Sequence, residues 1–428
     1  MENNKSFKKF ITLWIGELIS SIGGGLTAFG LGVYVFQKTQ STASVALVSL
    51  LAFLPTILLS APAGVLADRF DRRMMMILGD SLSAIGVLYI LICIMTGNDT
   101  LLNICIGVFI SSVFSSLLEP AYKATVTDLL TEEEFSKASG MVQMANSSKY
   151  LFSPIIAGFL LTVTTIKTLL IIDIATFFVT VSTCFVVKKG IKTKEIKRQS
   201  SFISEFKEGF NAIFVNKGIV ALVGLMSIVS FNMGFIQVLY TPMILSFSNE
   251  KILGIVETVS ALGMLGASLI IGIIAIKKNY SKILSSALFC TGVFMVVMGC
   301  RENLIIIGIG GFMFFATLPF ITMSADCLVR LNIPNEVQGR VWGLISIFSQ
   351  FGSVISFAIS GILAEYIFQP LLCKGGILED SVGKIIGVGK GRGIGLLIII
   401  AGILMEIMGI VIGFSKAIRK LEVDKCTE

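Results

Sequence analysis

Long apolar stretches, separated by short polar ones, fill nearly the whole of this chain. A helix needs roughly 20 apolar residues to cross the hydrocarbon core of a bilayer, and twelve stretches are long enough. They lie at about 10–36, 44–66, 74–96, 101–127, 138–163 and 168–187, and then at about 218–246, 252–276, 283–300, 303–329, 340–368 and 393–415. The pattern predicts an all-α polytopic membrane protein with twelve transmembrane helices.

A polar stretch at residues 188–217 divides these helices into six and six. We expect an N-terminal six-helix lobe at 1–187, a cytoplasmic central loop at 188–217, and a C-terminal six-helix lobe with a short cytoplasmic tail at 218–428. Within the loop an aromatic residue recurs every fourth position, opposite a polar face, which predicts an amphipathic helix. These residues are Phe202, Phe206, Phe210 and Phe214. Such a helix lies on the inner membrane surface or packs beneath the bundle, and the pattern leaves both open.

Composition and charge agree with this class of protein. Mean hydropathy is +0.90 and 14% of the residues are charged, against about 25% in a soluble domain. With the N-terminus inside, most Lys and Arg fall on the cytoplasmic side, so both termini should be cytoplasmic. The first stretch is too long for a cleaved signal peptide. The net charge of +7 follows from this orientation, and no basic soluble domain is present to bind nucleic acid.

Groups that usually perform catalysis or bind metals are sparse. The chain has no histidine, and its eight cysteines form no Cys-x-x-Cys pair. We therefore expect no metal site, no cofactor and no enzymatic activity. The glycine-rich segment Gly387–Gly395 lacks the residue order of a nucleotide-binding loop, so we expect a turn and a helix start there. Energy for any transport must then come from an ion gradient or from the gradient of the substrate.

A dense charged segment, Gly64-Val65-Leu66-Ala67-Asp68-Arg69-Phe70-Asp71-Arg72-Arg73, lies between the second and third apolar stretches. Asp68 at a helix end can accept backbone N–H groups from a facing helix and pair with a neighbouring arginine. Such contacts form only when two lobes meet on the cytoplasmic side. The segment thus predicts a cytoplasmic gate made of Gly64, Asp68, Arg69, Arg72 and Arg73. The arginines would also satisfy the positive-inside rule alone, and this alternative stays open.

A degenerate copy of the segment follows about 208 residues later, between the second and third helices of the second half. Its members are Gly272, Ile274, Ala275 and Lys277, with Ile276 in place of the acidic residue. Repeated six-helix halves are a design of transporters, in which two lobes rock around a site between them.

The complete segment Gly64–Arg73 resembles the loop signature of the major facilitator superfamily. Within that superfamily the chain is similar to the drug-exporter branch, which includes macrolide-efflux and siderophore-exporter proteins. The residues that carry this similarity are Trp14-Ile15-Gly16, Glu119-Pro120-Ala121, Asp173 with Phe177, and Gly339-Arg340-Val341. The resemblance implies alternating access, with helices one, four, seven and ten lining the substrate cavity.

In the fifth helix, Lys149-x-x-x-Ser153-Pro154-x-x-Ala157-Gly158 resembles the antiporter motif of this branch. Ser153, Pro154 and Gly158 keep the small residues and the proline, whereas Lys149 takes a position that is small in the motif. Lys149 lies about 18 Å along this helix, close to mid-membrane. An intramembrane lysine is costly unless it is paired or hydrated, so it is a functional candidate.

Two carboxylates are candidate partners for Lys149. Glu17 lies about 10 Å into the first helix, and Glu119 lies in the cytoplasmic third of the fourth. Without histidine, a desolvated carboxylate is the expected proton carrier. We expect proton coupling at Glu17, Lys149 and Glu119; a static Glu17–Lys149 salt bridge that orders the N-terminal lobe is the open alternative. Asp173, Glu257 and Glu365 are expected near the external ends, within reach of water.

Aromatic and polar residues of helices seven and ten are expected to line a cavity suited to apolar amphiphiles. The candidates are Asn232, Phe235, Gln237, Tyr240, Phe315 and Thr322. Each of these side chains could instead pack between helices or face lipid.

The expected function is that of a secondary active transporter in the cell membrane, acting as a monomer. It would export hydrophobic or amphipathic compounds of drug or macrolide type by proton antiport. Export of an endogenous peptide, siderophore or lipid-like metabolite is the alternative within the same class. A channel or a scramblase is the alternative outside it, although neither needs the gate segment or the repeat.

Overall fold

The structure is a computed structural model that describes residues 2–60, 62–63, 66, 70–130, 134–188, 210–211, 213–274, 276, 278–333 and 335–423. Within these ranges the regular structure is helical and no strand occurs. The contacts divide the chain into two compact units. Unit one is Met1–Lys197 with Asn249–Ile255, and unit two is Arg198–Ser248 with Val256–Glu428.

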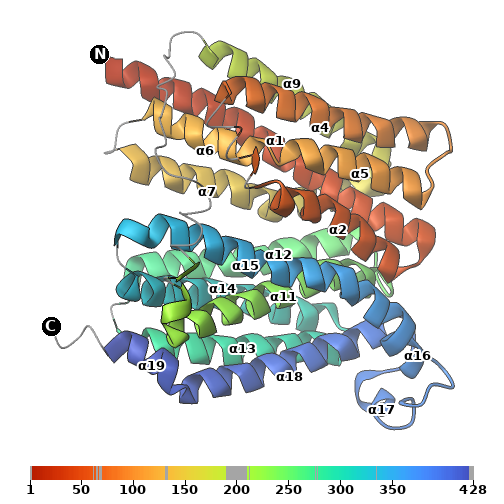
Figure 1. The fold of residues 1–428 in the computed structure, drawn as a ribbon. Helices are drawn as coiled ribbons and strands as arrows, with labels where there is room; N and C mark the ends of the chain where they lie inside the picture. Colours follow the sequence, from red (N-terminus) through yellow and green to blue (C-terminus); the bar gives the residue numbers. More distant parts are fainter. Residues whose placement is uncertain are drawn as a thin grey trace. The chain divides into compact units, whose positions relative to one another are not determined.

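Unit one is a bundle in which α1 packs against α9, α7 and α8, while α4 packs against α5 and α9 (Figure 1). Its helices are α1 (Glu2–Thr39), α2 (Thr42–Leu58), α4 (Arg72–Met95), α5 (Leu101–Ser115), α6 (Leu118–Leu129), α7 (Phe135–Leu151), α8 (Ser153–Val163) and α9 (Ile166–Lys188). Short polar residues begin several of them, as expected for helix N-caps. Asp71, for example, accepts hydrogen bonds from the backbone N–H groups of Arg73 at 3.0 Å and Met74 at 3.4 Å.

Unit two is built around the pairs α11 with α15 and α13 with α18, and α14 also packs on α13 (Figure 1). Its longer helices are α11 (Lys217–Leu245), α13 (Tyr280–Cys300), α14 (Leu304–Asn332), α15 (Asn335–Ile362), α18 (Arg392–Phe414) and, from Val256 on, α12 (Glu250–Ile274). Shorter elements are a π-helix (Leu363–Phe368), α16 (Gln369–Leu371), α17 (Gly383–Ile386) and α19 (Lys416–Val423).

A seam of glycines lets α13 and α18 approach closely. A Cβ added to Gly402 would lie 2.7 Å from the carbonyl oxygen of Gly292, and one added to Gly395 would lie 2.8 Å from that of Gly299. The seven-residue spacing on both helices keeps these glycines on one face. Close approach of backbones at small residues is a main source of helix association in lipid, where apolar side chains gain little from leaving the hydrocarbon.

Ten of the described helices are long and apolar enough to cross a membrane, and Thr42–Leu58 and Ser153–Val163 are shorter apolar helices. The fifth expected stretch, 138–163, is interrupted: α7 ends at Leu151 and α8 begins at Ser153 with a proline in its first turn. Proline supplies no N–H and disturbs the preceding turn, which explains the break. The total of twelve transmembrane helices stays a prediction.

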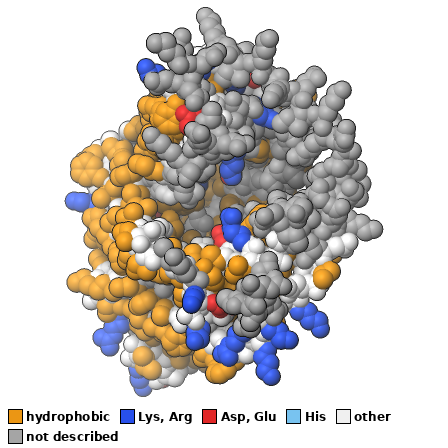
Figure 2. All heavy atoms as spheres, turned by 90° about the vertical axis from the view of Figure 1, so that its left-hand side faces the viewer, with side chains coloured by type: hydrophobic (Ala, Val, Ile, Leu, Met, Phe, Trp, Pro, Cys, Tyr) orange, Lys and Arg blue, Asp and Glu red, His pale blue; other side chains and the backbone are white. Residues whose placement is uncertain are grey.

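Large apolar side chains on the helix surfaces show which faces meet lipid. Phe178 is 70% exposed and Ile273 is 82% exposed. Figure 2 shows apolar side chains covering one flank of the molecule and Lys and Arg side chains along the lower edge of that view. Figure 2 looks onto the helix ends at the left of Figure 1, where basic side chains are expected at a membrane boundary.

The glycine-rich segment before α18 forms the expected turn and helix start. Gly387, Gly389 and Gly391 have φ values of 97°, 137° and 82°, and α18 begins at the next residue, Arg392. Such backbone conformations are open to glycine and strained for other residues. The Arg392 side chain is buried and donates a hydrogen bond to the carbonyl oxygen of Gly299 at 2.7 Å, which fixes the end of α13 against α18.

Candidate functional site

Three charged side chains of unit one form an interacting group, which we name the Glu17 cluster: Glu17 on α1, Glu119 on α6 and Lys149 on α7. The carboxylate of Glu17 interacts electrostatically with both other members and accepts a hydrogen bond from Ser21. Lys149 in turn interacts with Glu119 and Glu17. Glu17 is half-buried, whereas Glu119 and Lys149 are exposed. Charged side chains that solvent can reach fit a polar cavity better than a lipid-facing surface.

Glu17 and Lys149, both within the described part of the chain, do not form a direct ion pair with each other. The Lys149 ammonium lies 4.8 Å from the centre of the Tyr150 ring, a cation–π contact. Glu119 forms its own ion pair with Lys123 one helical turn later, at 2.6 Å. The structure thus brings together the three residues singled out from the sequence, and each also has another local partner: Ser21 for Glu17, Lys123 for Glu119 and Tyr150 for Lys149.

The antiporter-like motif positions Lys149 against α1. Ser153 is fully buried at the start of α8, and its hydroxyl donates a hydrogen bond to the carbonyl oxygen of Ile22 at 3.0 Å. A Cβ added to Gly25 would collide with the Ser153 hydroxyl and lie 3.0 Å from the Lys149 Cβ. Gly25 therefore lets α1 approach the α7–α8 break closely. Pro154 and Gly158 are also buried on α8.

Unit one also contains two buried carboxylates to which sequence reasoning gave no leading role. Asp80 on α4 and Asp173 on α9 are 1% and 2% exposed. Asp80 interacts electrostatically with both Glu17 and Asp173. One oxygen of each has no hydrogen-bond partner within the described part of the chain. The expectation that water reaches Asp173 is wrong, because α1 and its own helix enclose it.

The rule that any intramembrane carboxylate is a functional candidate would have found both residues. Asp173 was instead expected near an external end within reach of water, so it was not ranked as a candidate. Buried carboxylate oxygens without a hydrogen-bond partner are rare in proteins.

Of the expected gate, Gly64, Asp68 and Arg69 lie outside the described residues. Arg72 is half-buried, and Arg73 is 8% exposed and donates a hydrogen bond to the carbonyl oxygen of Val187 at 3.5 Å. This contact joins the start of α4 to the end of α9 within unit one. The gate role of the segment stays a prediction.

The six cavity candidates of unit two differ in exposure. Gln237 and Thr322 are exposed and Phe315 is half-buried, so these three present accessible surface. Asn232, Phe235 and Tyr240 are at most 5% exposed and pack against neighbouring helices. The Tyr240 hydroxyl, for example, lies beside the Ser260 hydroxyl of α12. The ring of Phe235 also stacks on that of Phe231 on its own helix, with centroids 5.2 Å apart.

A second set of polar side chains, not expected from the sequence, links α11 to α12 and lies against α14. The Tyr240 hydroxyl and the Ser260 hydroxyl are 3.1 Å apart, and Thr241 hydrogen-bonds to Glu257. A Cβ added to Gly311 on α14 would collide with both hydroxyls. Glu257, which was expected near a helix end within reach of water, is half-buried.

Metal binding has no support in the described part of the chain, where no group of three or more His, Cys, Asp or Glu side chains could hold an ion.

Comparison with known proteins gives relatives named as exporters. Macrolide efflux protein A of Streptococcus pyogenes is 27% identical over 384 residues, covering 86% of this chain and 92% of that protein. Multidrug resistance protein 2 of Bacillus subtilis is 23% identical over 343 residues, covering 78% of this chain and 83% of that protein.

Solved structures share the fold at low identity. The nucleoside transporter NupG matches with a TM-score of 0.72 and 14% identity, covering 95% of this chain and all of that one. A bacterial homologue of the lysosomal transporter Spinster, in an inward-facing and unoccupied conformation, matches with a TM-score of 0.72 and 13% identity, covering 98% of each chain.

The sequence pattern of the Major Facilitator Superfamily matches residues 13–357. With its many apolar helices and its transporter relatives, this chain is a multi-pass cell-membrane protein that belongs to the major facilitator superfamily.

Proposed function

We propose that this protein is a secondary active exporter of hydrophobic or amphipathic compounds, of drug or macrolide type, driven by proton antiport. The observation that carries the proposal is the Glu17 cluster, a set of mutually interacting charges on the helices of a chain that belongs to a transporter family. The names of the relatives favour export as the direction and macrolide-like compounds as the substrate class.

The cluster has the charge balance that coupling needs. With both carboxylates ionised and Lys149 protonated, it carries one net negative charge, and one proton on Glu17 makes it neutral. Because Lys149 and Glu119 interact with Glu17 with opposite signs, a movement of either changes how readily Glu17 holds a proton. Substrate binding that displaces Lys149 toward or away from Glu17 would therefore drive proton uptake or release.

The accessible surface of unit two suits an apolar substrate. Phe315 offers an aromatic face, and Gln237 and Thr322 supply a few hydrogen-bonding groups without a formal charge. Sites for small molecules commonly combine such a lining with few polar groups. Alternating access between two conformations would expose the bound compound first to one side of the membrane and then to the other.

Glu17→Gln tests the coupling. In proteoliposomes, addition of a macrolide should move protons through the wild type, and the variant should lose this proton movement at least about tenfold because Gln cannot exchange a proton. Proton flux is followed with a pH-sensitive dye inside the vesicles, and macrolide flux with a radiolabel.

Glu406→Gln is the matched control, since Glu406 is a half-buried carboxylate of α18 in unit two. It should keep coupling within about twofold of the wild type. Unaltered proton coupling in Glu17→Gln would overturn the proton-carrier role, and a macrolide flux through the wild type that ignores an imposed pH gradient would overturn antiport.

A further inference from the structure

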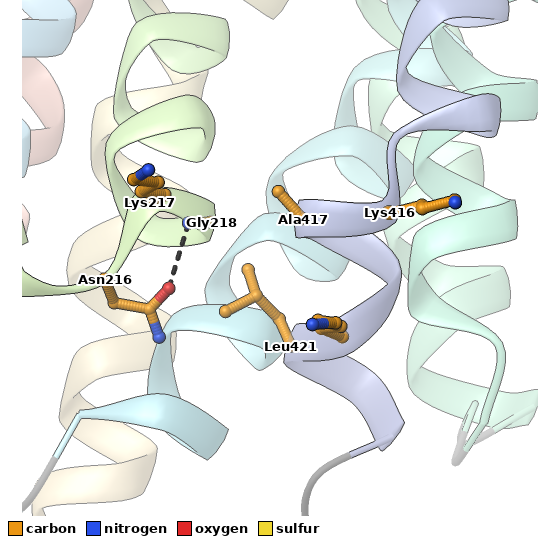
Figure 3. A pocket seen from close by; sticks show the side chains of 7 residues that line it. Asn216, Lys217, Gly218, Lys416, Ala417 and Leu421 are labelled. Carbon is orange, nitrogen blue, oxygen red and sulfur yellow. Dashed lines mark hydrogen bonds between the residues drawn. The ribbon is translucent and has the colours of Figure 1, made fainter.

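A basic pocket lies between the start of α11 and the C-terminal helix α19, in unit two. It has a volume of about 370 Å³ and is lined by Asn216, Lys217, Gly218, Lys416, Ala417, Lys420 and Leu421 (Figure 3). This volume falls within the roughly 300–1,000 Å³ of small-ligand pockets. We name it the α11–α19 pocket.

The walls of the pocket are fixed by packing. Helix α19 is amphipathic: Ile418 and Leu421 are at most 3% exposed, and its basic side chains face outward. Gly218 lets it approach α11, because a Cβ there would lie 2.7 Å from the Leu421 Cγ. The carbonyl oxygen of Leu421 also accepts a hydrogen bond from the Asn332 amide on α14 at 2.8 Å.

The nearest carboxylate of α19 is engaged elsewhere. Glu422 accepts hydrogen bonds from the backbone N–H groups of Tyr280 at 2.9 Å and Ser281 at 3.2 Å, and from the Ser281 hydroxyl at 2.7 Å. It thereby caps the N-terminus of α13. Burial alone would raise the pKa of Glu422, but these hydrogen bonds outweigh it and lower the pKa, so Glu422 stays ionised at its cap.

The pocket is therefore electropositive. Lys217, Lys416 and Lys420 are exposed, and none forms an ion pair with a carboxylate in the parts of the chain that the structure describes. The N-terminus of the 29-residue helix α11 adds its partial positive charge. Figure 3 shows the Lys416 side chain directed away from Asn216 and Gly218. Lys217 and Lys420 are thus the candidates for direct contact with an anion.

The position of the pocket indicates which class of anion it would bind. Helix α11 begins here and α18 ends here, both of them membrane-spanning by length and composition, so the pocket lies where hydrocarbon meets water. Apolar side chains flank it along the chain: Val215 is 85% exposed and Phe414 is 76% exposed. Basic groups next to exposed apolar ones match a lipid, which carries a phosphate head group and acyl chains on one molecule.

We propose that the α11–α19 pocket binds the phosphate-bearing head group of an anionic phospholipid. Lys217 and Lys420 contact the phosphate, and the exposed apolar side chains contact the acyl chains. Through α19 the lipid touches the element that caps α13 and packs on α11, so it stabilises this end of unit two. Free inorganic phosphate shares the head-group chemistry but lacks acyl chains.

The double variant Lys217→Gln with Lys420→Gln tests the proposal on the full-length protein in a neutral detergent. Native mass spectrometry counts retained phosphatidylglycerol against phosphatidylcholine. The wild type should prefer phosphatidylglycerol, and the double variant should bind it about 25-fold more weakly, at about fivefold for each lysine. Lys217→Arg with Lys420→Arg keeps both charges and should keep binding.

Lys282→Gln is the matched control, because Lys282 is an exposed lysine at the start of α13, on the same end of unit two but outside the pocket. Equal retention of phosphatidylglycerol by the wild type and the double variant would overturn the proposal. Displacement of the lipid by millimolar inorganic phosphate would assign the pocket to the free anion instead.

A measurement on the wild type alone covers the case in which the double variant does not fold. Hydrogen–deuterium exchange at residues 416–423 should slow when phosphatidylglycerol is added and stay unchanged with phosphatidylcholine. Exchange that responds equally to both lipids contradicts a site that recognises negative charge.

Discussion

At the scale of single residues, Asp99 ties the end of α1 to the turn between α4 and α5. Its carboxylate forms an ion pair with Lys38 at 2.5 Å and accepts a hydrogen bond from the Tyr34 hydroxyl. Lys38 also donates to the carbonyl oxygen of Asp99 at 2.6 Å. The hydrogen bond from Lys38, and after it that from Tyr34, lowers the pKa of the Asp99 carboxyl below its usual value.

Asp99→Asn should therefore destabilise the protein in a pH-dependent way. A carboxyl whose pKa is lower in the folded state stabilises that state above its unfolded pKa of about 3.9, and the stabilisation disappears as the pH falls through the folded pKa. The Lys38 side chain is 40% exposed, so we expect the loss to be small, about 1 kcal/mol and a fall of roughly 2 °C in Tm. Thermal unfolding at pH 7 and at pH 3 measures it: the difference between variant and wild type should shrink at pH 3. A constant difference would contradict the ionic origin.

The residues of the Glu17 cluster were recognisable from the sequence because charges within apolar helices are conspicuous. The sequence did not reveal that Asp80 interacts with both Glu17 and Asp173, since these three residues lie on three different helices. The pairing of Glu119 with Lys123, by contrast, follows the local i, i+4 spacing of a helix. Side-chain partners within a few ångströms depend on rotamers and helix rotation, which residue type alone does not encode.

At the scale of helices, the glycine seam between α13 and α18 makes a prediction about packing. Gly402→Ala places a methyl group 2.7 Å from the carbonyl oxygen of Gly292 and about 3.0 Å from the Met295 and Val296 side chains. Overpacking of this kind costs about 1–3 kcal/mol. Thermal unfolding in detergent should show a lower midpoint for this variant.

Gly308→Ala on α14 is the control for the seam, because a Cβ there meets no atom within 4 Å. It should leave the unfolding midpoint unchanged or raise it slightly, since alanine favours the helix. Equal loss in both variants would mean that helix propensity, and not the contact of α13 with α18, explains the effect.

The helix ends show which features depend on neighbouring residues and which depend on residues far apart in the chain. The interruption before Ser153-Pro154 follows from proline chemistry and is visible in the sequence. The cap of α13, by contrast, comes from a distant residue: Glu422 lies 142 residues after Tyr280 and 141 residues after Ser281. No local pattern predicts it, and Asn279, which precedes α13, makes no side-chain cap of its own.

At the scale of the whole molecule, the distribution of Lys and Arg predicts which ends of the helices face the cytoplasm. In a background without native cysteines, Ser381→Cys, before α17, should react with a membrane-impermeant maleimide in intact cells. Lys278→Cys, before α13, should react only after the cells are permeabilised, because basic loops stay inside. Both positions are exposed, so access to the reagent differs only by side. The reverse labelling pattern would contradict cytoplasmic termini.

The sequence alone determined the class of protein, the approximate spans and the family, because each depends on local or additive properties. In lipid every span must satisfy its own backbone hydrogen bonds, so apolar length marks a helix wherever it lies. Only the tertiary structure decided which faces pack. Phe178 is 70% exposed and Phe314 is fully buried, although both are phenylalanines in apolar helices. In a bilayer, hydrophobicity does not distinguish the protein interior from the lipid, so the contacts that build the Glu17 cluster, the glycine seam and the α11–α19 pocket come from helix packing.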